Sequence, residues 1–419
     1  MNRVFLLFLI TCSSLLSAQN GYPLYRSLAA VPAFDSAYVS TWGDYRVEAN
    51  RLPQAFLNKF IFGGSIDPSL KDRANRVLGR QNNLFFQSSY GASWTSMMRS
   101  RGAAYRRMGL AIAREHRAAL RFPPELFTLV FYGNAAPESS GEAFGPAAGY
   151  FYAGNRIAVW LERGSRDARL PWSIKYGASV MQINRFWMLD FPEGQVKTTP
   201  FSNETLLDTE LDIYFSDTSN NAQFGTDGWG FTASFDFSIN WKGWEWQASL
   251  SDFGILLASE KAIYLSRHAS KYYEGADIAE VFANGGSFSF SFEKDSLLSG
   301  LDVKTENTGF RMSSPALFSL FAQRKLGAWD MNFGLRYRYL SYPLPLFHAA
   351  VGYEDKAAGM HYWAALYYGG AGAPNLGMGL RKKFGEKVYL FFGSEHLLSP
   401  LFANNLGGLS SFLRLSWEL

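Results

Sequence analysis

Apolar and polar residues alternate on both sides of a two-residue turn between Trp229 and Leu250. From residue 229 to 241 the odd positions read Trp, Phe, Ala, Phe, Phe, Ile and Trp. After Lys242-Gly243 the apolar residues move to even positions, beginning at Trp244. A two-residue hairpin requires this switch, because the residues that flank its turn pair and point to the same face. The pattern predicts two long β-strands and shows no helical periodicity.

A second hairpin follows the same rule around Gly327-Ala328. Phe318, Leu320, Ala322 and Leu326 lie at even positions before the turn, and apolar residues follow at odd positions from 329 to 339. Phe321 breaks the pattern, as an inward-facing ring would. Strands of about ten to thirteen residues exceed the five or six of ordinary sheets and suit a tilted passage across a bilayer. Similar alternation occurs in 104–113, 172–180, 287–293 and 376–380. Membrane-spanning strands are therefore predicted, with a soluble all-β protein as the alternative.

The N-terminal segment has the layout of a secretory signal peptide. Arg3 precedes an apolar run from Val4 to Ile10, and small residues lead to a predicted cleavage after Ala18. The only cysteine, Cys12, lies in this segment and has an alternative interpretation as a lipoprotein cysteine. An exported chain cut at Ala18 would have no disulfides and no cysteine-ligated metal.

Composition narrows the class further. No run of 18 apolar residues follows the signal segment, so no transmembrane helix is predicted. Aromatic residues nevertheless make up 17% of the chain, and a membrane barrel places such rings in girdles at both interfaces. A formal charge of +4 is too small for a chain of this size to indicate nucleic-acid binding.

The chain ends on an alternating segment, residues 410–419, with Leu413, Leu415, Trp417 and Leu419 on one face. A closed barrel pairs its last strand with its first and so removes the free edge. The tail also resembles the C-terminal sorting signal of outer-membrane barrels, which implies the barrel assembly machinery as a partner.

We therefore expect an all-β fold, an antiparallel transmembrane β-barrel of about 14 strands (12 to 16), with a partly helical N-terminal lead-in. The expected organisation is a signal peptide at 1–18, a lead-in at 19–83 that plugs the lumen or sits on a rim, and the barrel at 84–419. Asp67 as N-cap, Pro68 and Gly79 bound one predicted helix, and 121–134 is another. Residues 190–223 and 258–286 are expected as mixed loops. Two-residue turns should face the periplasm and longer loops the outside.

Several passages resemble uncharacterised outer-membrane β-barrel families found in envelopes that also use type IX secretion. These passages are 121–134, 249–257, 272–282 and 375–400. The chain is more distantly similar to the long-chain fatty acid transporter group, whose Asn-Pro-Ala stretch near the mature N-terminus has its nearest match in Val31-Pro32-Ala33. The resemblance implies an outer-membrane barrel whose substrate is unassigned.

Strand parity selects the side chains expected inside the barrel and at its interfaces. The lumen-lining candidates are Lys175, Asp236, Asn240, Glu245, Gln247, Arg336, Arg338, Arg381, Lys383 and Arg414, with Glu418 on the same face. The aromatic girdle candidates are Trp229, Trp241, Trp244, Trp329, Tyr339 and Trp417. Two adjacent inward cations, Arg336 and Arg338, favour anions. The alternative is that inward charges serve only to pair with one another.

The stretch from Arg99 to Arg121 holds seven arginines and one acid, Glu115. One interpretation is that the arginines contact lipopolysaccharide phosphates or line a pore. The other is a strand whose ends snorkel to the membrane interfaces, with Met108, Leu110 and Ile112 facing lipid.

The function we expect is an outer-membrane channel or transporter for small solutes or apolar molecules in a Gram-negative-type bacterium. The alternatives are a non-conducting scaffold in a secretion or envelope complex, and a secreted soluble β protein. No enzyme, cofactor or metal is expected, because no histidine lies in an HxH or HExxH spacing and no GxSxG stretch occurs. Expected partners are outer-membrane lipids and lipopolysaccharide, the assembly machinery and envelope or secretion proteins, and no nucleic acid.

Overall fold

A computed structural model describes residues 37–101, 104–132, 142–143, 145–167, 170–198, 204–216, 225–274, 304–372, 374–401 and 407–419. The predicted signal segment with Cys12, the Val31-Pro32-Ala33 stretch and the alternating segment 287–293 lie outside these residues.

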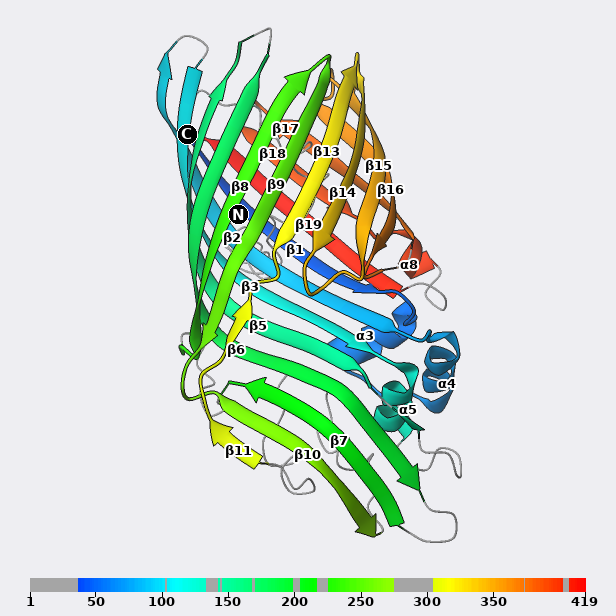
Figure 1. The fold of residues 1–419 in the computed structure, drawn as a ribbon. Coiled ribbons are helices and arrows are strands. Elements are labelled where there is room, and N and C mark those ends of the chain that lie inside the picture. The colour runs from blue at the N-terminus through cyan, green and yellow to red at the C-terminus, as the bar shows by residue number, and fades with distance from the viewer. Residues whose placement is uncertain are drawn as a thin grey trace, which may run out of the picture.

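Fourteen strands form a closed antiparallel barrel (Figure 1), which confirms the predicted fold and strand number. In order around the ring they are β1 (Tyr38–Ala49), β2 (Asn82–Arg101), β3 (Ala104–Phe122), β5 (Ala147–Ser165), β6 (Trp172–Thr198), β8 (Gly228–Trp241), β9 (Trp244–Ala258), β13 (Leu317–Leu326), β14 (Trp329–Arg338), β15 (Leu344–Asp355), β16 (Met360–Gly370), β17 (Asn375–Phe384), β18 (Val388–Ser394) and β19 (Gly407–Glu418). The last strand closes the ring, because β19 pairs with both β18 and β1 and places Leu415 opposite Thr41.

Short turns join strands at one end of the barrel, the upper end in Figure 1, which we call the turn end. Lys242 and Gly243 both have positive φ, 54° and 78°, as a type I′ hairpin turn requires. Gly327 has φ 67° at the first position of the β13–β14 turn. Both predicted hairpins form in the predicted register, with Trp241 opposite Trp244 and Leu326 opposite Trp329. The opposite end is called the loop end below.

Alternation divides each strand between an outer and an inner face. On β8, Phe235 is 48% exposed while its neighbour Asp236 is buried. Phe321, which breaks the sequence pattern, is buried and faces inward, where its ring lies 5.6 Å from that of His348. Large apolar side chains are exposed on strands around the ring, among them Leu110, Val159, Phe253, Phe333, Leu366 and Leu415. An apolar outer surface of this extent indicates a wall that is covered by lipid.

The barrel begins earlier than the sequence predicted. Tyr38–Ala49, inside the expected lead-in, is the barrel strand β1, and the predicted start at residue 84 falls within β2. The lead-in appeared separate because its two helices, α3 (Gln54–Phe62) and α4 (Pro68–Val77), interrupt the strand pattern.

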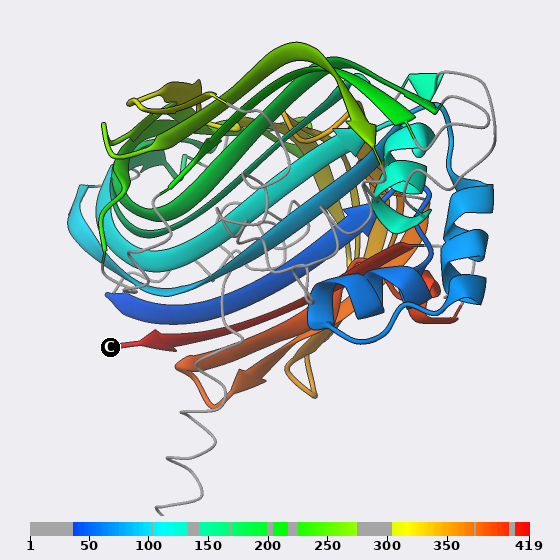
Figure 2. The ribbon, with the colours of Figure 1, turned by 90° about the horizontal axis from the view of Figure 1, so that it is seen from below.

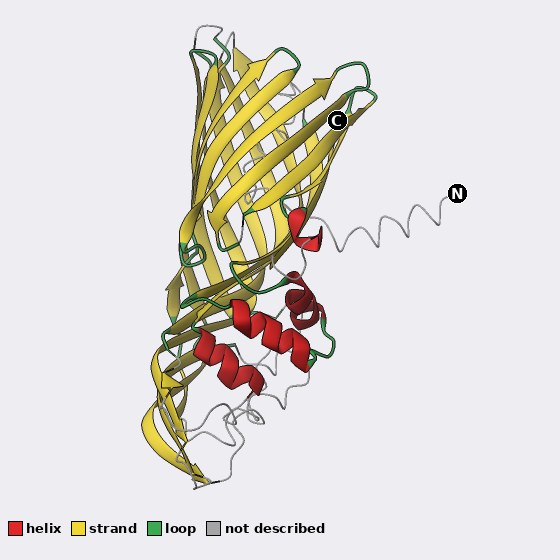
Figure 3. Cartoon of the chain, turned by 90° about the vertical axis from the view of Figure 1, so that its right-hand side faces the viewer, coloured by secondary structure: helices red, strands yellow, loops and turns green. Residues whose placement is uncertain are grey.

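The helices of the connection lie on the rim at the loop end, as Figure 3 shows, together with α5 (Pro124–Tyr132). They pack against Val47 and Ala49, whose side chains point away from the face that carries Arg46 and Glu48. The N-cap of α4 is Asp67, as predicted, and hydrogen bonds from Ser69 and Leu70 hold its pKa below the usual value.

No helix within the described ranges is long and apolar enough to cross a membrane.

A smaller sheet extends one wall of the barrel beyond the loop end. The first part of β6 pairs with β8, and its last part, from Trp187 to Thr198, pairs instead with β7 (Glu204–Phe215). Next come β10 (Ile263–Glu274) and β11 (Lys304–Asn307), seen at the bottom of Figure 1. These strands correct the expectation of mixed loops at 190–223 and 258–286. Seen along the barrel in Figure 2, the long strands curve around the interior and the helices lie to one side.

Candidate functional site: the barrel lumen

The structure places the ten predicted lumen-lining residues at three levels of burial. Asp236, Arg336 and Arg338 are buried inside the barrel. Lys175, Gln247, Arg381 and Arg414 are partly buried. Asn240, Glu245 and Lys383 are exposed near the short turns that end their strands. The predicted girdle residues Trp229, Trp241, Trp329, Tyr339 and Trp417 have exposed rings, and Trp244 is partly buried.

A β-bulge turns Asp252 into the lumen. Strict alternation on β9 would place this residue on the outer face with Trp246 and Leu250. Between Leu250 and Phe253 the register with β8 shifts by one residue, and Asp252 adopts φ 58°. Its side chain is therefore 1% exposed, and Phe253 faces outward in its place. Bulges commonly redirect a side chain in this way, and a non-glycine residue with positive φ is held by its surroundings.

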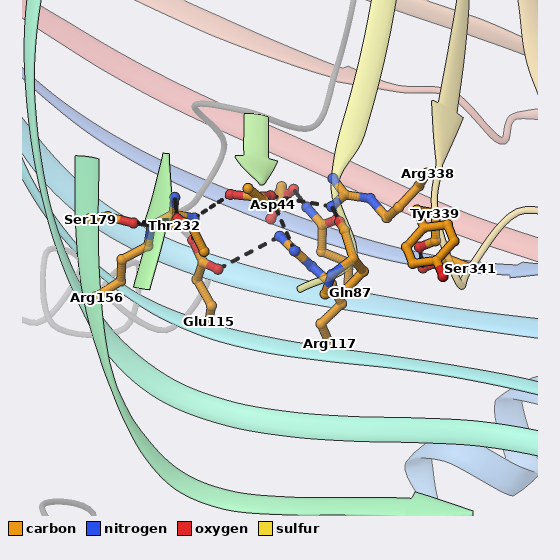
Figure 4. Close-up of polar contacts among 12 residues, drawn as sticks. Asp44, Gln87, Glu115, Arg117, Arg156, Ser179, Thr232, Arg338, Tyr339 and Ser341 are labelled. Carbon is orange, nitrogen blue, oxygen red and sulfur yellow. Dashed lines mark hydrogen bonds and ion pairs between the residues drawn. The ribbon is translucent and has the colours of Figure 1, made fainter. Parts of the chain in front are cut away.

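Three guanidinium groups meet at the Asp252 carboxylate. The Nη1 atoms of Arg156, Arg117 and Arg338 lie 2.6, 3.2 and 3.3 Å from its oxygens. Glu115 joins the group, because its carboxylate lies 3.1 Å from Arg156 and 3.6 Å from Arg117. Figure 4 shows the side chains of Glu115 and Arg117 from β3, Arg156 from β5 and Arg338 from β14 converging. We call these five residues the Asp252 network.

Hydroxyl groups fix one member of the network. Arg156 Nε donates to Ser179 Oγ at 2.8 Å, and its Nη2 donates to Thr232 Oγ1 at 3.0 Å. The two hydroxyls also lie 2.6 Å from each other. With each nitrogen held by a separate partner, the guanidinium of Arg156 has little freedom to rotate away from Asp252.

The Asp252 network joins opposite sides of the barrel. In the ring of fourteen strands, β3 with Arg117 and β14 with Arg338 are six steps apart, where seven is the largest possible separation. Asp252 on β9 contacts both. Nearby, Phe85 on β2 and Tyr342, just after β14, have ring centroids 5.4 Å apart. The lumen is therefore crossed at this level by ion pairs and by packed rings.

A second buried group of charges lies at the loop end of the same lumen. Glu395 lies just after β18. Its Oε2 atom is 3.0 Å from Nη2 of Arg46 on β1 and 3.4 Å from Nη2 of Arg336 on β14. Arg46 Nε also donates to Glu48 at 2.6 Å. Both predicted selectivity residues, Arg336 and Arg338, are thus paired with carboxylates, which agrees with the alternative interpretation of inward charges.

Near the turn end, charged groups pair with nearer neighbours instead. Lys175 and Asp236 are opposite each other on β6 and β8, with Nζ and Oδ2 4.0 Å apart. Lys325 Nζ donates to Glu354 at 2.6 Å, and Arg381 lies 3.6 Å from the same carboxylate. None of these described contacts bridges opposite walls.

One cluster has the composition of a hydrolase triad and lacks its geometry. His396 Nδ1 lies 3.0 Å from Ser410 Oγ, and its Nε2 lies 3.6 Å from Glu48 Oε1. The hydroxyl of Ser410 also accepts the N–H of Glu395 at 2.7 Å, and both Ser410 and His396 are buried. A nucleophile needs access to substrate and a base within hydrogen-bond reach that is itself oriented, and this serine has no such access.

No group of three or more histidine, cysteine, aspartate or glutamate side chains among the described residues could hold a metal ion.

The predicted lumen residues did not include Glu115, Arg117 or Asp252. Glu115 and Arg117 have the opposite parity to Met108 on the same strand, so parity alone could have placed them inside. For Asp252 the signal was a change of parity, since exposed apolar residues are even-numbered up to Leu250 and odd-numbered from Phe253. That change marks the bulge.

Comparison with known proteins gives structural matches of low score. No family model matches the chain, and no curated protein matches it. Among solved structures, a deletion mutant (deltaS2S3) of the TodX monoaromatic hydrocarbon channel is 10% identical over 97% of both chains, with a TM-score of 0.43. The P. putida toluene transporter TodX is 10% identical over 92% of this chain and 91% of its own, with a TM-score of 0.40. The translocator domain of the autotransporter NalP from Neisseria meningitidis is 7% identical over 94% and 92%, with a TM-score of 0.31. Similarity at this level carries no information about substrate.

Proposed function

We propose that the chain is an outer-membrane channel or transporter for small solutes whose lumen is closed at rest. The observation that carries this proposal is the bridge from Arg117 through Asp252 to Arg338, which joins strands six steps apart in the ring. A solute that crosses the barrel must pass this level, so the bridge has to open for each passage.

The outer surface supports the location. Apolar side chains exposed around the ring require lipid, and the exposed rings of Trp241, Trp329 and Trp417 lie near the turn end, where a girdle is expected. Outer-membrane lipids, with lipopolysaccharide in the outer leaflet, are the proposed surroundings. The paired terminal strand β19 is the proposed contact for the barrel assembly machinery.

Opening requires that buried ion pairs separate. Removing one partner from such a pair leaves the other charge buried and unpaired, at a cost of about 3–5 kcal/mol. A closed state of this kind conducts only when a solute or a neighbouring group replaces the lost contacts. This requirement for replaced contacts distinguishes the proposed closed channel from a pore that is permanently filled with water.

Single-channel conductance in planar bilayers tests the proposal. Wild type is compared with Arg336→Ser/Arg338→Ser, which removes both bridges to β14. The control is Arg381→Ser, which removes the contact with Glu354 near the turn end. We expect brief or small currents from wild type and the control, and larger, longer openings from the double variant. Steady current from wild type at the level of the double variant would overturn the closed-lumen proposal.

A second candidate is a non-conducting scaffold in an envelope or secretion complex. The observation that favours it is the extension beyond the ring, where α3, α4, α5 and the sheet of β7, β10 and β11 form a surface that a simple pore does not need. Absence of current from both wild type and the double variant, together with a stoichiometric partner co-purified from outer membranes, would support this function instead.

A further inference from the structure

One carboxylate in the lumen occupies a position that suits an exchangeable ligand. Asp252 is contacted by the guanidinium groups of Arg117, Arg156 and Arg338, each within 3.3 Å. Guanidinium is the side-chain group whose planar donors best match carboxylate and phosphate oxygens. Three such groups from three strands surround an oxyanion from different sides, which a single structural ion pair does not require.

The charges of the network exceed what Asp252 alone neutralises. Three arginines face two carboxylates, Asp252 and Glu115, so these five groups carry one net positive charge. The Nε of Arg117 is buried and makes no hydrogen bond among the described residues. A further carboxylate, Asp44, lies beside the network and accepts a hydrogen bond from Gln87 at 2.9 Å (Figure 4). Counting Asp44, three guanidinium groups face three carboxylates, so an added oxyanion has to replace one of these carboxylates rather than join them.

The backbone at Asp252 is strained, so its conformation can relax once the contacts that hold the side chain are replaced. The residue lies at a bulge with φ 58°, a left-handed conformation that is unfavourable for a non-glycine residue. The ladder with β8 is regular on both sides of the bulge, so a local change at this position leaves the rest of β9 paired. Arg156, in contrast, is held by Ser179 and Thr232.

We infer that Arg117, Arg156 and Arg338 form a binding site for the oxyanion group of a solute, a carboxylate or a phosphate, and that Asp252 is an internal ligand which such a group displaces. Exchange of one anion for another keeps the three guanidinium groups paired while it releases β9 from the opposite walls. The idea that the solute passes through rests on the proposed function, whereas the binding itself is measurable without transport.

Isothermal titration of the full chain in detergent micelles tests the site directly, with inorganic phosphate and acetate as probes. In Asp252→Asn the internal ligand is neutral, and we expect phosphate or acetate to bind about ten-fold more tightly than to wild type. The matched control is Asp236→Asn, a buried lumen acid on the neighbouring strand, which should bind as wild type does. Comparing the two probes identifies the preferred oxyanion. Equal binding to the two variants would overturn the inference.

A second measurement applies should Asp252→Asn fail to assemble. This measurement uses single cysteines in a Cys12→Ser background. Thr232→Cys places a thiol beside Arg156. The control is Ser238→Cys, six residues further along the same face of β8. We expect the ratio of modification rates by an anionic sulfonate and a cationic trimethylammonium thiosulfonate reagent to be about ten-fold higher at position 232. Equal ratios, or no reaction at position 232 with either reagent, would contradict the site. If the chain binds oxyanions and carries no current in bilayers, the proposed transport function is contradicted while the binding site is supported.

Discussion

The two ends of the lumen hold their charges in different ways. Near the turn end, Lys175 pairs with Asp236 on the next strand of the ring, and both belong to the same stretch of wall. Toward the loop end, Asp252 is almost fully buried and holds groups on β3, β5 and β14. The same residue types therefore serve two purposes, and the strands they connect decide which.

Pairs within one stretch of wall and pairs across the lumen differ in what they constrain. A pair on adjacent strands adds to a ladder that backbone hydrogen bonds already fix, and partial exposure to water weakens it. A pair across the lumen fixes the distance between walls that no backbone ladder joins directly. Its buried charges are also costly to separate. Charge alone therefore does not predict conduction; the topology of the contacts does.

An intermediate case lies near the turn end, where His361 Nε2 and Asp330 Oδ2 are 2.7 Å apart. The two residues belong to β16 and β14, with Gly352 of β15 between them. A Cβ on Gly352 would lie 2.6 Å from Asp330 and 2.7 Å from His361, so glycine is what allows the contact. This contact spans one strand and still follows the wall.

Removal of residues 410–419 should have the largest effect, because it abolishes the ring on which both charge arrangements depend. β19 pairs with β1 and β18, and its loss leaves two open edges. We expect no heat-modifiable, folded species in outer-membrane fractions. The control is Leu419→Phe, which keeps the strand and should assemble. Normal insertion of the truncated chain would show that the barrel closes without β19.

Asp252→Ala should destabilise the folded barrel by about 3–5 kcal/mol, because it leaves three buried guanidinium groups short of a partner. Asp236→Ala, whose lysine is partly exposed to water, should cost at most about 1 kcal/mol. Urea unfolding in lipid vesicles, followed by tryptophan fluorescence, measures both. Similar losses from the two substitutions would remove the distinction between the two ends of the lumen.

The same comparison explains what the sequence could and could not predict. Alternation placed Asp236 and Arg338 inside and Phe235 outside, since two-residue turns fix the register. It failed at Asp252, where one extra residue inverts the parity. It also failed at β1, which two helices separate from the rest of the pattern. Which inward charges meet across the lumen depends on ring order, and no local pattern contains that information.

Phe235→Arg tests the assignment of faces on which the comparison rests. Phe235 is exposed in the middle of β8, and an arginine there should cost about 2–4 kcal/mol in a bilayer. Asn240→Arg, on the inner face near the turn, is the matched control and should be close to neutral. The same unfolding assay in vesicles measures both variants. Equal tolerance of arginine at both positions would mean that the outer face is not in lipid.

The smallest effect is expected at Lys325 and Glu354, an ion pair near the turn end whose lysine side chain is 59% exposed. Because solvent screens such a pair, Lys325→Ala should reduce the free energy of unfolding by about 0.2–1 kcal/mol.

A double-mutant cycle of Lys325→Ala with Glu354→Gln measures the coupling energy between these two charges. A parallel cycle of Arg338→Ser with Asp252→Asn measures the coupling energy of a pair across the lumen. The first coupling should stay below about 1 kcal/mol, and the second should be several-fold larger because both charges are buried. Equal couplings would mean that burial and topology do not set the strength of these contacts, and the closed lumen would then need another cause.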